Sequence, residues 1–304
     1  MDLDFQQLAS LEPALAREVL PGFLGAYVDP DCGAAAAFEE AVRGAVAETS
    51  DDELRELLDR FATAGSEYRL YPVSSAARRI SRACMGVMTT ETEVLGLEHL
   101  RAATAGPCLI LCNHLSYVDT QLTDLLLTQA GAADIADRLV TVAGPKVYEA
   151  PFRRIAAICL NTIKTAQSSH VSHNEAILSP REVGRIALET VRQATELMIE
   201  GRPVLLYGEG SRSRTGRLGP FLRGVSKYAA ASDLAVLPAA ISGTDRVFPI
   251  DSLTMHPAAV SLRFCAPIHV VEREARAAVD EAWEAIAAAL PERHRPASGT
   301  HPSS

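Results

Sequence analysis

The residues whose types and spacing best suit catalysis are His114 and Asp119. They stand five positions apart, after an apolar run. An imidazole beside a carboxylate is the arrangement of a general base with an orienting acid. A continuous helix turns about 100° per residue, so two positions with this spacing would point away from each other. The chain must therefore turn between these two residues if they act as a pair.

The flanking residues indicate a strand followed by a helix. Cys108 to Cys112 is an uninterrupted apolar stretch, typical of a short buried strand. Ser116, with Asp119 three positions later, resembles a capping box and predicts a helix that continues through Leu127. His114 would then lie in the strand-to-helix turn, within reach of Asp119. The alternative is an ordinary turn histidine, with Asp119 serving only as a negative charge at a helix N-terminus.

A second segment, Gly208 to Gly216, follows another buried-strand pattern, Val204 to Tyr207. Its glycines let the backbone approach a ligand closely. Arg212 and Arg214 carry permanent positive charge in a fork geometry that fits phosphate oxygens. This pattern favours an anion site. The plainer alternative is a solvated loop with a surface salt bridge between Glu209 and Arg212, which would contribute little.

Together the two segments resemble the glycerolipid acyltransferase family, whose NHxxxxD and EGSRS blocks occur here in the family's order. That family includes enzymes that acylate 1-acylglycerol 3-phosphate and glycerol 3-phosphate. Thr92 to Leu100 is similar to the family's strand before the first block, and Val236 to Thr244 is similar to its late proline-containing block. The chain departs from the family between these blocks. Where members carry a glycine and then an arginine after a short strand, this chain has Ile155 to Ile158 and then Ile163 and Lys164. The resemblance covers roughly residues 92–270.

The resemblance implies roles for the residues that match the family's blocks. His114 would remove the proton of an acceptor hydroxyl, while Asp119 fixes the imidazole tautomer. The substrate-binding residues that it implies are Glu209, Gly210, Ser211, Arg212, Arg214, Lys146 and Pro238. Arg214 and Lys146 would add charge for the phosphate, and Pro238 would be a structural element on the acyl-donor side.

The expected activity is therefore transfer of a fatty acyl group from acyl-CoA or acyl carrier protein to 1-acylglycerol 3-phosphate, giving phosphatidic acid in phospholipid biosynthesis. The acyl donor is a co-substrate, and no cofactor or metal is expected. One alternative keeps the chemistry and changes the acceptor to glycerol 3-phosphate or to the hydroxyl of another lipid or secondary metabolite. A non-enzymatic alternative is a lipid-binding scaffold related to the family.

Two other site patterns are weaker. Ser116 lacks the Gly-x-Ser-x-Gly elbow of a hydrolase, so helix capping is the preferred explanation. His170 and His173 have no cysteine or carboxylate partner at zinc-site spacing, which favours loop histidines without a metal.

Composition bounds the location and the partners. The formal net charge of −9 argues against nucleic-acid binding. The six cysteines include no Cys-x-x-Cys pair, which is typical of reduced thiols in a cytoplasmic protein. The sequence shows no secretory signal and no run of about eighteen apolar residues. A lipid substrate would then be met at a membrane surface, with peripheral association at the inner face of the cell membrane as the alternative to a purely cytoplasmic location.

From residue 92 short apolar runs alternate with longer amphipathic ones, which predicts an α/β fold with a mixed sheet flanked by helices. We expect an N-terminal helical domain over 1–90, an acyltransferase domain over 91–292 and a disordered tail over 293–304. The predicted strands lie near 93–96, 108–112, 139–143, 158–163, 203–207, 235–241 and 259–264. The predicted helices of this part lie near 118–130, 149–156, 181–200, 222–231 and 273–289.

Overall fold

The computed structural model describes residues 4–166, 178–231, 233–270 and 274–302. The strands in these ranges are β1 (Leu70–Tyr71), β2 (Thr89–Leu95), β3 (Cys108–Cys112), β4 (Val140–Ala143), β5 (Asn161–Lys164), β6 (Val204–Tyr207), β7 (Ala235–Ser242), β8 (Ala258–Phe264) and β9 (Ile268–His269). They form one sheet of nine strands in the described ranges, in the order β1-β5-β4-β6-β3-β7-β8-β2, with β9 paired to β7. The sheet is mixed, which confirms the predicted fold class.

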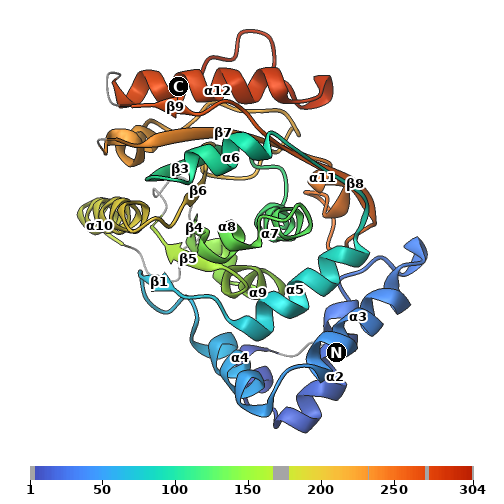
Figure 1. Cartoon of the computed structure of the whole chain (residues 1–304). Helices are drawn as coiled ribbons and strands as arrows, with labels where there is room; N and C mark the ends of the chain where they lie inside the picture. Colours follow the sequence, from blue (N-terminus) through green and yellow to red (C-terminus); the bar gives the residue numbers. More distant parts are fainter. Residues whose placement is uncertain (1–3, 167–177, 232, 271–273, 303–304) are drawn as a thin grey trace.

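The helices surround this sheet (Figure 1). The α-helices are α1 (Phe5–Ala9), α2 (Pro13–Gly25), α3 (Ala35–Ala47), α4 (Asp51–Thr63), α5 (Ser75–Val87), α6 (Leu97–Ala103), α7 (Asp119–Gln129), α8 (Ala133–Arg138), α9 (Pro151–Ile158), α10 (Pro180–Ile199), α11 (Thr244–Val247) and α12 (Ala275–Ala289). Short 3-10 helices are η1 (Pro30–Cys32), η2 (Pro145–Tyr148), η3 (Arg223–Ala230) and η4 (Glu292–His294).

The central strands β5, β4, β6, β3 and β7 run parallel to one another. The sheet reverses direction outside them, because β1 is antiparallel to β5 and β8 is antiparallel to β7. Carboxyl ends of parallel strands meet at one edge of a sheet, where loops bring side chains together. Cys112, which ends β3, pairs with Tyr207, which ends β6. The turns that follow these two strands therefore leave the sheet side by side.

Two apolar cores lie on the two faces of the sheet. Successive side chains of a strand point to opposite faces. Accordingly, Cys108, Ile110 and Cys112 belong to one core, and Leu109 and Leu111 belong to the other. The first core includes residues of α5, α7, α8 and α9, and the second includes residues of α10 and α12. In Figure 1, α12 (red) and the helices α2, α3 and α4 (blue) lie at opposite ends of the molecule.

The N-terminal region is helical as far as α5. The Ser50 side chain accepts a hydrogen bond from the Glu53 backbone, and the Glu53 side chain accepts one from the Ser50 backbone, so the predicted capping box starts α4. Leu54, Leu57 and Phe61 on this helix are buried in the first core, which also contains Ile110 of β3. The boundary of a separate domain near residue 90 stays a prediction.

A buried ion network joins α5 to α7 and α8. The Arg82 guanidinium donates to both Asp124 oxygens, at 2.7 and 3.0 Å, and the Asp124 side chain is only 3% exposed. Arg78 Nε lies 3.5 Å from Asp124 Oδ1, and Arg78 Nη1 donates to Asp137 Oδ1 at 2.8 Å. Because α7 also begins at Asp119, this network fixes the N-terminal helices to the helix that carries that carboxylate.

Two predicted elements differ from the structure. A strand was expected from 158, but α9 continues to Ile158 and β5 begins at Asn161. The helix persists because Ile155, Ala157 and Ile158 pack into the core. The helix expected near 222–231 is the 3-10 helix η3, in which Gly224 and Val225 have low α-helix propensity.

The C-terminal segment packs against the loop that follows β6. Leu218 N–H donates to the His294 carbonyl at 2.9 Å, and Phe221 N–H donates to the Pro302 carbonyl at 2.9 Å. His294 is 2% exposed. The disordered tail expected over 293–304 stays a prediction; among its described residues, 293–302, the carbonyls of His294 and Pro302 accept these two bonds.

None of the helices in the described ranges combines the length and the apolar character that crossing a bilayer demands.

Asp124→Asn should lower the free energy of unfolding by about 3 kcal/mol, because it leaves two arginines together without a buried counter-charge. Asp52→Asn is the matched control, since the Asp52 side chain is 97% exposed and pairs with Arg55 on the helix surface. The control should cause no measurable change. Urea denaturation measures both variants, and a wild-type midpoint for Asp124→Asn would contradict the expected role of the network.

Candidate active site

The turn after β3 brings His114 and Asp119 into contact. His114 Nδ1 lies 2.7 Å from Asp119 Oδ2, and the exposed fractions of the two side chains are 18% and 0%. A carboxylate can only accept a hydrogen bond, so Nδ1 carries the proton in the neutral imidazole, and Nε2 of that form keeps its lone pair. This tautomer is the one that a general base requires.

The same carboxylate oxygen closes the turn. Asp119 Oδ2 also accepts hydrogen bonds from the N–H groups of Leu115 at 2.7 Å and Ser116 at 3.0 Å. Only half of the predicted capping box forms, because the Asp119 N–H donates to the Ser116 carbonyl at 3.4 Å and not to the Ser116 hydroxyl. That hydroxyl donates to the Phe248 carbonyl at 2.9 Å and accepts from the Val118 N–H at 3.5 Å. The predicted capping role of the Ser116 hydroxyl was therefore wrong. That hydroxyl instead anchors the turn to the segment after α11.

Neighbouring side chains hold the turn and the imidazole ring. The Asn113 amide donates to the Ile241 carbonyl and accepts from the Ile241 N–H, both at 2.9 Å, so it continues the sheet beyond β3. The Tyr207 ring stacks on the His114 imidazole, with centroids 4.2 Å apart and planes 18° apart. The hydroxyl groups of Tyr207 and Thr120 lie 2.9 Å apart in a hydrogen bond. Burial raises the pKa of Tyr207 well above its ordinary value, so the stacked ring is a neutral phenol.

Glu209 bridges two loops and does not pair with Arg212. Its Oε2 accepts from the His114 N–H at 2.7 Å, and its Oε1 accepts from the Gly219 N–H at 2.8 Å. Burial raises the pKa of Glu209 to about 7, against the lowering effect of these two backbone hydrogen bonds. Because the protein's own backbone engages both oxygens, Glu209 acts as a positioning residue for the His114 turn.

The Gly208–Gly216 loop lies directly against this turn, since Ser213 N–H donates to the His114 carbonyl at 2.8 Å. Gly208 is required by packing, because a Cβ atom there would lie 2.5 Å from the Phe221 ring. Gly210 has φ +70°, a conformation that favours glycine. The next residue, Ser211, is exposed.

The remaining predicted residues are more scattered. Arg214 is exposed, and no ion pair of its guanidinium occurs among the described residues. Lys146 lies in η2, at the same sheet edge but after β4. Pro238 is buried within β7 opposite Leu111 of β3, and its carbonyl accepts from the Cys265 N–H at 2.9 Å.

Tyr117 and Arg153 are two residues near the site that the sequence analysis missed. The guanidinium carbon of Arg212 lies 3.4 Å from the centroid of the Tyr117 ring, and that of Arg153 lies 5.0 Å from it. Arg153 Nη1 also donates to the Tyr117 hydroxyl at 3.1 Å. The aromatic residue inside the NHxxxxD block was visible in the sequence, but no spacing linked it to an arginine on α9.

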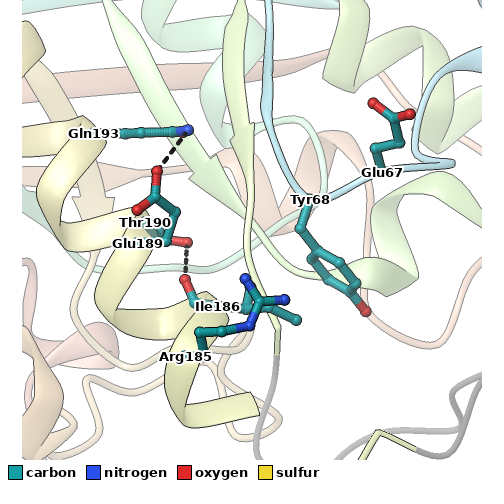
Figure 2. Close-up of a pocket in the computed structure, with 7 residues that line it drawn as sticks. All are labelled: Glu67, Tyr68, Arg185, Ile186, Glu189, Thr190 and Gln193. Atoms are coloured by element: carbon teal, nitrogen blue, oxygen red, sulfur yellow. Dashed lines mark hydrogen bonds between the residues drawn. The ribbon is translucent and has the colours of Figure 1, made fainter. Parts of the chain in front are cut away.

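A cavity of about 240 Å³ lies elsewhere, between the segment before β1 and α10 (Figure 2). Its lining includes Tyr68, Arg185 and Glu189, and Figure 2 shows the Gln193 amide donating to the Glu189 carboxylate. It shares no residue with the His114 cluster, by which we mean His114, Asp119, Tyr207, Glu209 and Arg212. We therefore assign this cavity no part in the chemistry.

No group of three histidine, cysteine or acidic side chains in the described ranges is arranged to hold a metal ion. His170 and His173, predicted to be loop histidines, lie outside the described residues.

The model of the Acyltransferase family matches residues 91–242, which is half of the chain and includes the whole His114 cluster. The chain therefore belongs to this acyltransferase family.

Similar proteins include a chloroplastic 1-acyl-sn-glycerol-3-phosphate acyltransferase of Brassica napus, 26% identical over 53% of this chain and 40% of that protein. A 1-acyl-sn-glycerol-3-phosphate acyltransferase of Cocos nucifera is 27% identical over 52% of this chain and 44% of its own length. The matches thus span less than half of these relatives. The crystal structure of the 1-acyl-sn-glycerophosphate acyltransferase of Thermotoga maritima aligns with 94% of this chain and 95% of that chain, at a TM-score of 0.47 and 16% identity.

Glu209→Gln should flatten the pH dependence of stability between about pH 4.5 and 7. A carboxyl group whose pKa rises from 4.5 to about 7 on folding binds its proton more tightly in the folded protein. Its stabilising effect is therefore complete below pH 4.5 and is lost as the pH rises through 7. Across this window the unfolding free energy of the wild type should fall by about 3 kcal/mol more than that of the variant. Denaturation at several pH values measures the difference, and parallel curves would contradict it.

Proposed function

We propose that this protein transfers a fatty acyl group from acyl-CoA or acyl carrier protein to the free hydroxyl of 1-acylglycerol 3-phosphate, giving phosphatidic acid. One observation carries the proposal: the backbone of the Arg212 loop is hydrogen-bonded directly to His114, from Ser213 N–H to the His114 carbonyl at 2.8 Å. This bond joins the loop of the proposed phosphate-binding cation to the residue proposed as the base. The relatives named 1-acyl-sn-glycerol-3-phosphate acyltransferases support the same acceptor.

In the proposed mechanism His114 Nε2 takes the proton of the acceptor hydroxyl while the hydroxyl oxygen attacks the thioester carbonyl. Asp119 stabilises the imidazolium that forms. The tetrahedral intermediate then collapses, the carbon–sulfur bond breaks, and the thiol leaves with the proton held by His114. Because the substrate supplies the nucleophile, no acyl-enzyme is required.

The other matched residues support binding in this proposal. Arg212, with Arg214 and Lys146 contributing further charge, attracts the phosphate of the acceptor. Gly210 and Ser211 form the turn that presents Arg212. Pro238 belongs to the structural support on the acyl-donor side.

A second candidate acceptor is glycerol 3-phosphate or the hydroxyl of another lipid or secondary metabolite. The departure at Lys164 favours keeping this candidate, because the family's arginine at that point is replaced by a cation that binds elsewhere in this protein. The non-enzymatic alternative, a lipid-binding scaffold, is disfavoured by the contact between the partly exposed His114 and the buried Asp119, which orients the imidazole.

We also propose that the protein works in the cytoplasm or peripherally at the inner face of the cell membrane. A lipid acceptor must be met at the bilayer surface, and an amphipathic protein surface is sufficient for that encounter. Acyl-CoA and acyl carrier protein are the proposed donors, and both present the acyl group as a thioester.

His114→Ala should lower acceptor-dependent release of thiol from acyl-CoA by about 10³-fold, because general-base catalysis supplies roughly 10² to 10⁴. The matched control is His269→Ala, which changes an exposed histidine on β9. Mass spectrometry of the products, with both donors and with phosphorylated and unphosphorylated acceptors, identifies the acceptor. Near-wild-type transfer by His114→Ala would rule out the proposed base. If the unmodified protein released no thiol with any acceptor, the scaffold alternative would stand.

Tyr207→Leu should lower kcat by about tenfold with little change in the acceptor KM, because the imidazole loses the ring that holds it while the acceptor contacts remain. Tyr207→Phe keeps the stacked ring and removes only the hydrogen bond to Thr120, so a smaller decrease is expected. Steady-state kinetics at saturating donor compares the two variants. Equal losses would assign the effect to the hydroxyl and contradict a role for stacking.

A further inference from the structure

The Arg153–Tyr117–Arg212 cluster holds more positive charge than the surrounding side chains balance. Glu149 is the carboxylate that approaches it, with 4.0 Å between its Oε2 and Arg153 Nη2, and the two side chains are partly exposed. Within the described ranges no carboxylate forms an ion pair with Arg212. Two guanidinium groups repel each other, and an aromatic face offsets this repulsion only modestly. In a chain with a net charge of −9, this local excess favours an anionic ligand.

Both guanidinium groups contact the same tyrosine, Arg212 over the face of its ring and Arg153 through a hydrogen bond to its hydroxyl. Burial raises the pKa of Tyr117, but the positive charges of Arg212 and Arg153 bring the pKa below its usual value. The two donors come from different elements, the loop after β6 and α9, and they meet three positions after His114 in the chain. The oxygens of one phosphate could therefore bridge them beside the proposed base.

Lys164 is the last residue of β5 and occupies the position where the family resemblance leads us to expect an arginine. Its side chain makes contacts elsewhere in this protein, and the residue is only 9% exposed. Its ammonium group donates to the Gly65 carbonyl and lies 4.6 Å from the centroid of the Tyr68 ring and 5.5 Å from that of Tyr148. Because these contacts direct Lys164 toward the N-terminal part of the chain, a second cation for the site must come from another element.

We propose that Arg153 is a specificity-determining residue that binds the acceptor phosphate together with Arg212, with the Tyr117 hydroxyl holding its guanidinium in place. This inference rests on the proposed function and deepens it. The competing explanation is that Arg153 only ties α9 to the His114 turn. In that case its removal would change stability without changing discrimination between acceptors.

Acceptor kinetics separates the two explanations. Arg153→Gln should raise KM for 1-acylglycerol 3-phosphate by about tenfold or more with little change in kcat, because a charge-assisted, bidentate contact is lost. KM for the unphosphorylated 1-acylglycerol should stay unchanged. Arg153→Lys keeps the charge without the planar fork and should give an intermediate shift. The matched control is Arg192→Gln, since Arg192 pairs with Glu189 and Glu196 on the surface of α10 and should affect neither acceptor.

Calorimetric binding of inorganic phosphate gives a readout that does not need turnover. The unmodified protein and Arg192→Gln should bind phosphate equally, and Arg153→Gln should bind it at least about tenfold more weakly. If no acyl transfer to any acceptor occurred, the proposed function would fail, and this measurement would still report on the anion site.

Two outcomes would overturn the inference. One is unchanged phosphate affinity together with an unchanged ratio of KM values for the two acceptors in Arg153→Gln. The other is weaker phosphate binding with an unchanged KM ratio, which would assign the cluster to free phosphate. If Arg153→Gln did not fold, the same measurements on Arg153→Lys and Tyr117→Phe would test the inference, because both variants preserve the packing of the cluster. Wild-type KM ratios in these two variants would equally overturn it.

Discussion

A single carboxylate oxygen, Asp119 Oδ2, organises the site. It accepts hydrogen bonds from the His114 ring and from the N–H groups of Leu115 and Ser116. A buried carboxylate is tolerated only where donors replace the water that it has lost. The turn after β3 must therefore keep these donors in place in order to bury Asp119. The same carboxylate oxygen thus both closes the turn and selects the tautomer of the imidazole.

The elements around this oxygen add support from several directions. Glu209 connects the His114 backbone to the Gly219 backbone, and Asn113 continues the sheet toward Ile241. Asp124 lies on α7, the helix that begins at Asp119, and forms ion pairs with Arg78 and Arg82 of α5. The N-terminal helices are thus coupled through one rigid helix to the carboxylate that orients the proposed base. A site held by packed helices and backbone hydrogen bonds can keep the precise geometry that acyl transfer requires.

The departure from the family at Lys164 has a structural counterpart. Lys164 lies at the end of β5, where it is enclosed by Gly65 and by two tyrosine rings. Arg153 lies on α9, and its guanidinium donates a hydrogen bond to the Tyr117 hydroxyl. In our proposal, the second cation of the site therefore comes from α9 and not from the end of β5.

Local patterns in the sequence were enough to predict the central framework. The apolar runs that became β3 and β6 predicted buried strands, and the spacing of His114 and Asp119 predicted a turn between them. The capping box of α4 was also predicted correctly, because its hydrogen bonds join residues three positions apart. Interactions of this kind depend on short-range geometry, which the order of residues encodes directly.

Only the tertiary structure decided which distant groups meet. Glu209 binds the backbone of His114 across 95 positions of the chain, so the local salt bridge that its neighbourhood suggested does not form. Ser116 bonds to Phe248, 132 positions away, and leaves the predicted cap incomplete. Arg153 reaches Tyr117 because α9 and the His114 turn pack together. The residue types and the local turns were therefore determined by the sequence, whereas hydrogen-bond partners were chosen by burial, since a buried donor or acceptor bonds to whatever group packing brings closest.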